Sequence, residues 1–321
     1  MPSALVHPST ANLPGPAETA AALPYPALVQ EISRLLRDDS VHVPARLVQA
    51  LPGGGSLFVM PANDAHVAIT KLITFTPANA CSVRPTIQGD VVVFDVATGA
   101  RTLVLDGPTV TARRTAAVSA LAALRLAPRR DGPLLIVGAG VQGRAHLEAF
   151  VQCLGVKEVV IASRSAASAQ ALATYARALG LVARTTEDPD AALAACPLVV
   201  TCTPASGVVL RALPGPDHFI AAVGAFTPRM VELDPGLCRH VAAQGRVVVD
   251  TADATHEAGD LLQAGLDVAR FETLAAVERR LPHAPGRTEK ETAGVARPGP
   301  VLFKSCGWAG WDLAAARLAL R

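Results

Sequence analysis

The chain has 321 residues, half of them hydrophobic, and a formal net charge of +2 at pH 7. This length and apolar content are typical of a globular protein with two domains. The charge comes without a basic run and only 4% of the residues are aromatic, so we expect no nucleic-acid partner. No stretch reaches the roughly 18 consecutive apolar residues that a membrane helix needs, so no membrane span is expected.

The cysteines are scattered, and no two of them form a C-x-x-C pair. We interpret them as reduced core residues and predict no metal site. Residues 1–22 are rich in Ala and Pro and lack the basic start and apolar segment of a signal peptide, so we predict an N-terminal tail and a cytoplasmic protein. The six cysteines are Cys81, Cys153, Cys196, Cys202, Cys238 and Cys306.

A β-rich first domain is predicted after the tail. Leu28, Ile32 and Leu35 have the spacing of an amphipathic helix. Strand-like runs follow it, separated by glycine, proline and Asn-Asp turns. These runs are 42–51, 56–60, 67–75, 90–95 and 102–105.

The pattern changes at Thr111, which we expect to cap a long Ala- and Leu-rich helix ending near Pro128. Short apolar runs then alternate with helical segments, as in a parallel sheet with crossover helices. The predicted fold class is therefore α/β, with a Rossmann domain over 116–300 and a β-rich α+β domain over 23–115, to which 301–321 return. The apolar runs are 134–137, 159–162, 198–202, 219–223 and 247–249.

The glycine-rich segment Gly138-Ala139-Gly140-Val141-Gln142-Gly143 lies between a predicted strand and a predicted helix. In that context the first glycine permits a tight turn, the second lets the backbone approach a pyrophosphate, and the third lets helix and strand pack closely. We therefore predict that these six residues bind a dinucleotide. The alternative is a tight turn without a ligand.

The second strand of the Rossmann pattern ends at Ser163-Arg164-Ser165. An acidic residue here would favour the ribose hydroxyl of NAD, whereas an arginine with hydroxyl neighbours suits the 2′-phosphate of NADP. We expect these residues to bind NADPH, with NADH possible. The alternative is a solvated Arg164, with the cofactor choice made elsewhere.

Two further loops follow predicted parallel strands, at the strand ends where ligands collect. One is Thr203-Pro204-Ala205, and the other begins at Gly224-Ala225 and continues to Phe226. We expect both loops to border the cofactor.

Two cationic residues of the first domain lie among apolar ones. Lys71 shares a strand face with Ile69 and Ile73, which is unusual unless that face lines a cavity. Arg46 lies between apolar pairs just before the glycine turn at 53–55. The alternatives are a lysine that reaches solvent from an edge strand and an ordinary surface arginine.

Arg113 and Arg114 fall in the first turn of the helix that Thr111 is expected to cap, where cations oppose the helix dipole. A bound anion would resolve that conflict, and an arginine can hold a carboxylate through two parallel hydrogen bonds. The pair therefore indicates a carboxylate substrate. A surface pair at modest energetic cost is the alternative.

Several segments along nearly the whole chain resemble the ornithine cyclodeaminase and mu-crystallin family. Within it the similarity is greatest to the ketimine reductases, which act on Δ1-pyrroline-2-carboxylate and Δ1-piperideine-2-carboxylate. Segments 69–77 and 85–90 carry that finer resemblance. The family segments are Leu51-Pro52-Gly53-Gly54-Gly55, Met60-Pro61, Lys71-Leu72, Arg114-Thr115-Ala116-Ala117, 138–143, Glu257-Ala258-Gly259-Asp260-Leu261, Phe303-Lys304-Ser305 and Asp312-Leu313-Ala314-Ala315-Ala316.

The resemblance implies a homodimer whose first domain binds the substrate and pairs the subunits. By position, Arg46 and Arg114 would hold the carboxylate of a small cyclic imino acid, and Lys71 would face its nitrogen as the catalytic group. Thr86 would lie in the same pocket. We place Thr115, which follows Arg114, beside the cofactor.

The chain departs from the cyclodeaminases at Phe226, where those enzymes carry an aspartate that handles the amino group of the substrate. We therefore expect hydride transfer from NADPH to C2 of a cyclic ketimine, giving L-proline or L-pipecolate. Three alternatives remain: ornithine cyclodeamination with tightly held NAD, non-catalytic binding of NADPH and a small molecule, and a dehydrogenase for open-chain 2-oxo acids.

Overall fold

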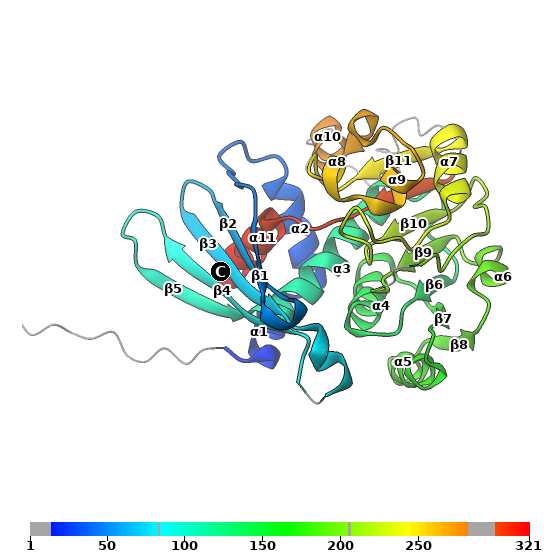
Figure 1. Cartoon of the computed structure of the whole chain (residues 1–321), viewed down its shortest axis with the longest axis horizontal. Helices are drawn as coiled ribbons and strands as arrows, with labels where there is room; N and C mark the ends of the chain where they lie inside the picture. The colour runs from blue at the N-terminus through cyan, green and yellow to red at the C-terminus, as the bar shows by residue number, and fades with distance from the viewer. Residues whose placement is uncertain (1–13, 83, 205–206, 282–298) are drawn as a thin grey trace, which may run out of the picture.

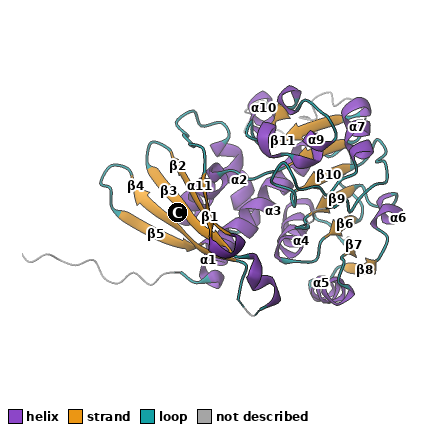
Figure 2. Ribbon diagram, viewed as in Figure 1, coloured by secondary structure: helices purple, strands orange, loops and turns teal. Residues whose placement is uncertain are grey.

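The computed structural model describes residues 14–82, 84–204, 207–281 and 299–321. Figure 1 shows an antiparallel sheet on one side of the molecule and a parallel sheet on the other, with helix α3 (Gly107–Leu126) between them. Colouring by secondary structure shows the same two sheets, with helices covering both faces of the parallel one (Figure 2). The predicted α/β class and its two sheet regions are confirmed.

The antiparallel sheet runs in chain order, β1-β2-β3-β4-β5. Its inner face packs against α3 and the C-terminal helix α11 (Ala309–Ala319), and helix α2 (Tyr25–Leu35) packs against both of these helices. The side chains of β3 alternate between the two faces, as the period of a strand requires. The strands are β1 (Leu47–Leu51), β2 (Gly55–Asn63), β3 (Val67–Phe75), β4 (Ile87–Asp95) and β5 (Arg101–Asp106).

Residues 16–22 are a helix, α1 (Pro16–Ala22), rather than part of a tail. This helix packs against α3 and β5. Its Thr19 is fully buried, and the Thr19 hydroxyl accepts a hydrogen bond from the backbone N–H of Asp106 at 3.1 Å. The expected tail is therefore wrong for these residues, and residues 1–13 lie outside the described part of the chain.

Helix α3 begins at Gly107, so the prediction that Thr111 caps it is wrong. The cap is Asp106, whose carboxylate accepts a hydrogen bond from the backbone N–H of Thr109 at 2.8 Å. Pro108 fits here because the first turn of a helix leaves its N–H groups unpaired. Arg113 and Arg114 consequently lie in the second turn, and the expected conflict with the dipole at the helix start does not arise.

The second sheet is parallel, with strand order β12-β11-β13-β10-β9-β6-β7-β8. The five predicted apolar runs form β6, β7, β9, β10 and β11. Prediction missed β8 because this edge strand is largely exposed and carries no apolar run. The strands are β6 (Leu134–Val137), β7 (Glu158–Ala162), β8 (Val182–Thr186), β9 (Leu198–Thr201), β10 (Phe219–Ala222), β11 (Arg246–Val249), β12 (Glu272–Thr273) and β13 (Val301–Lys304).

Helices connect the parallel strands and cover both sheet faces (Figure 2). Buried apolar residues on each face form the core of this domain. The helices are α4 (Val141–Leu154), α5 (Ala166–Ala178), α6 (Pro189–Leu193), α7 (Pro235–Gln244), α8 (Ala254–Glu257), α9 (Gly259–Gln263) and α10 (Leu274–Arg280).

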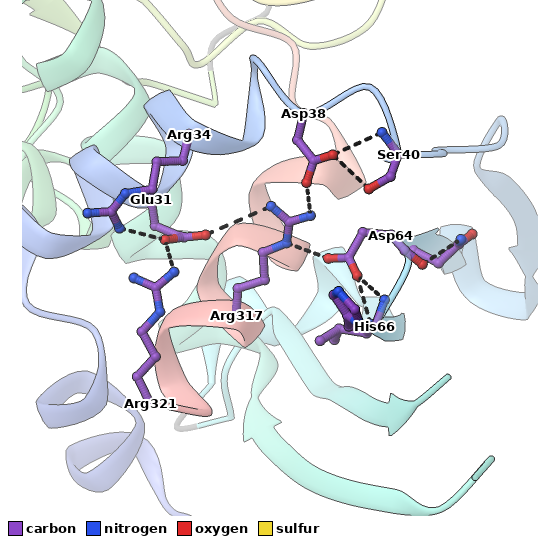
Figure 3. A network of polar contacts seen from close by, with 10 residues as sticks. Glu31, Arg34, Asp38, Ser40, Asp64, His66, Arg317 and Arg321 are labelled. Carbon is purple, nitrogen blue, oxygen red and sulfur yellow. Dashed lines mark hydrogen bonds and ion pairs between the residues drawn. The ribbon is translucent and has the colours of Figure 1, made fainter. Parts of the chain in front are cut away.

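The C-terminal segment divides between the two domains, which the expected return of 301–321 to the first domain did not foresee. Strand β13 pairs with β10 and β11 inside the parallel sheet, and only α11 packs against β2 and β3. Arg317 fixes that helix, because its guanidinium forms ion pairs with Asp64 and, at 2.6 Å, with Asp38 (Figure 3). The figure shows Glu31, Arg34 and Arg321 completing this network.

The five cysteines whose side chains are described are unpaired, and four of them are buried. No helix in the described ranges is long and apolar enough to cross a membrane. Among the same residues, no group of His, Cys, Asp and Glu side chains could hold a metal ion.

Candidate active site

The glycine turn lies where the strand order reverses, because β6 pairs with β7 on one side and with β9 on the other. Gly138 has a φ of 118°, and a Cβ there would lie 2.8 Å from the backbone oxygen of Cys202. A Cβ on Gly143 would lie 2.0 Å from the backbone oxygen of Gly138, so the helix can approach the strand this closely only with glycine. These two roles agree with the predicted ones.

Gly140 faces open space, since nothing lies within 4 Å of a Cβ built on it. It precedes the first turn of α4, whose first residue, Val141, is 73% exposed. The helix N-terminus is therefore open to an anion beside a backbone that carries no side chain. This geometry fits the pyrophosphate of a dinucleotide.

The loop after β7 places Ser163, Arg164 and Ser165 at the carboxyl edge of the sheet. Arg164 is exposed, and the Ser165 hydroxyl caps α5 by accepting a hydrogen bond from the backbone N–H of Ser168 at 3.2 Å. Ser163, Arg164 and Ser165 thus directly precede the N-terminus of α5, and this position suits a phosphate.

The loops after β9 and β10 are joined by Glu232, a fully buried residue that the sequence did not single out. Its carboxylate accepts from the backbone N–H of Thr203 at 2.6 Å and from that of Gly224 at 2.7 Å. The hydroxyls of Thr201 and Thr203 also donate to it. These bonds hold the two predicted cofactor loops together.

Asp260 holds the backbone of Glu232, since the Asp260 carboxylate accepts a hydrogen bond from the backbone N–H of Glu232 at 2.6 Å. Its other oxygen meets the ammonium of Lys304 at 2.7 Å, and both side chains are fully buried. Burial lowers the pKa of Lys304, but the charges of Asp260, Cys306 and Glu232 together raise it by more, so the net shift is upward and this lysine stays charged. Asp260 and Lys304, which lie in segments that carry the family resemblance, therefore support the loops expected to border the cofactor.

In the predicted loops, Ala225 is fully buried and Phe226 is 39% exposed. Pro204 is exposed, and Ala205 lies outside the described residues.

Lys71 is almost completely buried, and its Nζ lies 2.7 Å from Oδ2 of Asp312 on α11. The lysine is thus neither solvated nor at an edge, because β3 is the middle strand of the sheet. The other oxygen of Asp312 meets Nε of Arg114 at 3.3 Å. One buried carboxylate therefore joins the catalytic candidate on β3 to a carboxylate-binding candidate on α3.

Burial lowers the pKa of Lys71 to about 8. The charge of Asp312 opposes this shift, whereas the charges of Arg114 and Arg46 reinforce it. Arg46 is therefore within electrostatic reach of the same ammonium. A lysine with such a pKa can both hold and give up a proton near neutral pH.

The guanidinium of Arg114 faces Gly307, which has a φ of 92°. A Cβ on that glycine would lie 3.4 Å and 3.6 Å from the two terminal nitrogens. Buried Asp250 fixes the loop, because one of its oxygens accepts from the backbone N–H groups of Cys306 and Gly307 at 2.8 Å each. The backbone of Gly307 thus packs closely against the fork of Arg114, where a larger residue would crowd it.

Arg46 forms an ion pair with Glu257 of α8, in the other domain. Thr86 and Thr115 are not brought into this cluster by any described contact. The backbone oxygen of Thr86 accepts from Thr76, and the hydroxyl of Thr115 donates to the backbone oxygen of Thr111 at 2.7 Å. The roles of both threonines stay predictions.

Asp312 and Glu257 are the functional candidates that sequence reasoning missed in this cluster. Both lie in segments that carry the family resemblance. Neither segment shows which cation its acid will meet, because Asp312 is separated from Lys71 by most of the chain.

Residues 28–320 match the model of the ornithine cyclodeaminase/mu-crystallin family. The chain belongs to this family. It is 40% identical over 309 residues to Delta(1)-pyrroline-2-carboxylate reductase 2 of Burkholderia ambifaria, covering 94% of this chain and 93% of the other. It is 39% identical over 310 residues to the Delta(1)-pyrroline-2-carboxylate/Delta(1)-piperideine-2-carboxylate reductase of Azospirillum brasilense, with the same coverage.

Among solved structures, Thermococcus litoralis Delta(1)-pyrroline-2-carboxylate reductase in complex with NADH and L-proline has a TM-score of 0.79. The match covers 96% of this chain and 93% of that one, at 23% identity. At that identity the similarity shows that the two share the fold of the family. The predicted family and fold class are thus confirmed.

Proposed function

We propose that this family member uses NAD(P)H to reduce the C=N bond of cyclic ketimine carboxylates, Δ1-pyrroline-2-carboxylate and Δ1-piperideine-2-carboxylate, to L-proline and L-pipecolate. The observation that carries the proposal is the buried contact of Lys71 with Asp312, which in turn meets Arg114. In this proposal Lys71 is the proton donor and Arg114 binds the substrate carboxylate. The names of the Burkholderia and Azospirillum relatives support the same reaction.

The arginines orient the substrate in this proposal. Nε of Arg114 meets Asp312, and its terminal nitrogens lie beside Gly307, which has no side chain. Two parallel N–H groups match the two oxygens of a carboxylate, so Arg114 fixes the ring plane as well as its position. Arg46 supplies the second cation.

Lys71 acts on the ring nitrogen. Hydride attack at C2 needs a protonated, electrophilic C=N group, and the Lys71 ammonium supplies or shares that proton. Asp312 keeps the ammonium pointed into the site, because its other oxygen is held by Arg114.

The dinucleotide would be held by the glycine turn from Gly138 to Gly143 and by the loops that Glu232 joins. The chemistry that this cofactor supplies when bound is a hydride. We favour NADPH because Arg164 and its neighbouring hydroxyls suit a 2′-phosphate. Phe226, in the place of the cyclodeaminase aspartate, argues against deamination of ornithine.

An assay of the purified protein with both ketimines tests this function. We expect NADPH to be consumed with one or both rings, with L-proline or L-pipecolate as product, and NADH to be used less well. No consumption of either cofactor with either ring would contradict the proposal, and ammonia from ornithine without net cofactor use would favour the cyclodeaminase.

We also infer that the protein is a homodimer that pairs through the outer face of the antiparallel sheet. This face carries Leu57, Val59, Val92 and Val104, all only half-buried, and Leu72, which is 41% exposed. Such a patch is typical of an interface between subunits. The substitution Val59→Asp should convert the dimer to a monomer in sedimentation measurements, and an unchanged dimer would refute this interface.

The unpaired cysteines among the described residues support a reducing compartment such as the cytoplasm.

A further inference from the structure

The ion pair between Arg46 and Glu257 joins the two domains. Arg46 precedes β1 of the antiparallel sheet, and Glu257 is the last residue of α8 in the parallel-sheet domain. Their side chains are 21% and 20% exposed, so the contact lies within the molecule rather than on an open surface.

Only part of the guanidinium is used by this contact. One terminal nitrogen of Arg46 meets Oε1 of Glu257. Across the described residues, Nε and the other terminal nitrogen have no hydrogen-bond partner. The planar fork of arginine carries five N–H donors, so the bonded nitrogen fixes the plane while the others stay available.

The backbone that follows Glu257 is tightly packed. A Cβ on Gly259 would lie 2.1 Å from the backbone oxygen of Met230 and 2.5 Å from that of Thr227. The segment that carries Glu257 is thereby fixed against the loop that follows Phe226. The backbone that carries Glu257 is therefore held in place beside Arg46.

We infer that Glu257 is a positioning residue for substrate binding: it holds Arg46 across the domain boundary so that the free donors of Arg46 receive the substrate carboxylate. The inference rests on the proposed function, which supplies the carboxylate. It assigns Glu257 no part in proton or hydride transfer.

The charges of the site favour the same role. Lys71, Arg46 and Arg114 carry three positive charges when Lys71 is protonated, and Asp312 and Glu257 carry two negative ones. The remaining positive charge matches one carboxylate.

The test is the steady-state kinetics of Glu257→Gln with Δ1-pyrroline-2-carboxylate and NADPH. The glutamine keeps the shape but loses the charge that fixes Arg46. We expect KM for the ketimine to rise about tenfold, as for loss of a hydrogen bond between charged groups, with kcat and KM for NADPH within about twofold. In an Arg46→Gln background the same substitution should raise KM no further.

Glu272→Gln is the matched control. Glu272 is equally exposed, at 20%, and forms an ion pair with Arg246 that lies entirely within the parallel-sheet domain. It should leave KM unchanged. If Glu257→Gln does not fold, as judged by thermal unfolding and NADPH binding, Glu257→Asp replaces it, since its shorter side chain loses the contact but keeps the charge.

An unchanged or lowered KM, a loss confined to kcat, or an additive effect in the Arg46→Gln background would overturn the inference. Failure of the proposed function looks different, because the wild-type protein would then consume no NADPH with the ketimine.

Discussion

The ammonium of Lys71 and the carboxylate of Asp312 lie 2.7 Å apart, and both side chains are buried. Lys71 lies on β3 of the antiparallel sheet, and Asp312 lies on α11, which packs against the inner face of that sheet. Removing one partner of such a pair leaves a buried charge without its counter-charge, which is far costlier than losing a surface pair. The contact therefore ties the two elements together and raises the pKa of Lys71, the proposed proton donor, against the effect of burial.

Asp312→Asn should lower activity more than it lowers cofactor binding. Without the carboxylate, the pKa of Lys71 falls further, since burial and the charge of Arg114 then act unopposed. We expect kcat/KM to fall about 100-fold and NADPH affinity, measured by fluorescence titration, to stay within about threefold. Asp64→Asn, which removes another buried acid that meets α11, is the control and should leave kcat/KM nearly intact. Equal losses in both variants would indicate a general structural effect.

The pH dependence of the wild-type enzyme should report the same lysine. A proton donor must be protonated, and Lys71 with a pKa of about 8 holds its proton below that pH and loses it above. The profile of kcat/KM should therefore fall as pH rises through about 8. In Asp312→Asn the falling limb should move to lower pH. A limb that stays in place in that variant would show that another group titrates.

Arg164→Ser should change the choice of cofactor. Its guanidinium is expected to pair with the 2′-phosphate, so we predict that KM for NADPH rises about tenfold while KM for NADH hardly moves. Arg184→Ser, at an exposed position of the next strand, is the control for the loss of one surface cation. Equal KM values for NADPH in wild type and Arg164→Ser would place the cofactor choice elsewhere.

Arg317→Leu should destabilise the fold, because Arg317 meets Asp38 at 2.6 Å and the buried acid Asp64 (Figure 3). We expect about 2–4 kcal/mol of lost unfolding free energy in urea titrations. Arg34→Leu removes a partner of Glu31 that is 56% exposed, and should cost less than about 1 kcal/mol. Similar losses in the two variants would refute the special position of Arg317.

The sequence was most informative where structure depends on local chemistry. The glycines of the dinucleotide turn are required by the local path of the backbone from strand to helix, so their spacing predicts their roles. Lys71 was found because it interrupts an apolar strand face. The prediction of Thr111 as the cap of α3 was wrong because Asp106, with Pro108 in the first turn, already starts the helix.

The partners of the charged groups could not be predicted in the same way. Asp312 and Glu257 meet Lys71 and Arg46 only after both domains have folded, and no local pattern encodes such a meeting. The same holds for Glu232, whose four donors come from two strands and their loops.

The most direct measurement is the fate of the hydride. The enzyme is supplied with NADPH that carries deuterium at the transferable position of C4, together with Δ1-pyrroline-2-carboxylate, and the product is analysed by mass spectrometry and chiral chromatography. We predict L-proline with one deuterium at C2, and none from Lys71→Ala, which should still bind NADPH. Unlabelled product, or no product from the wild-type protein, would contradict the proposed reduction.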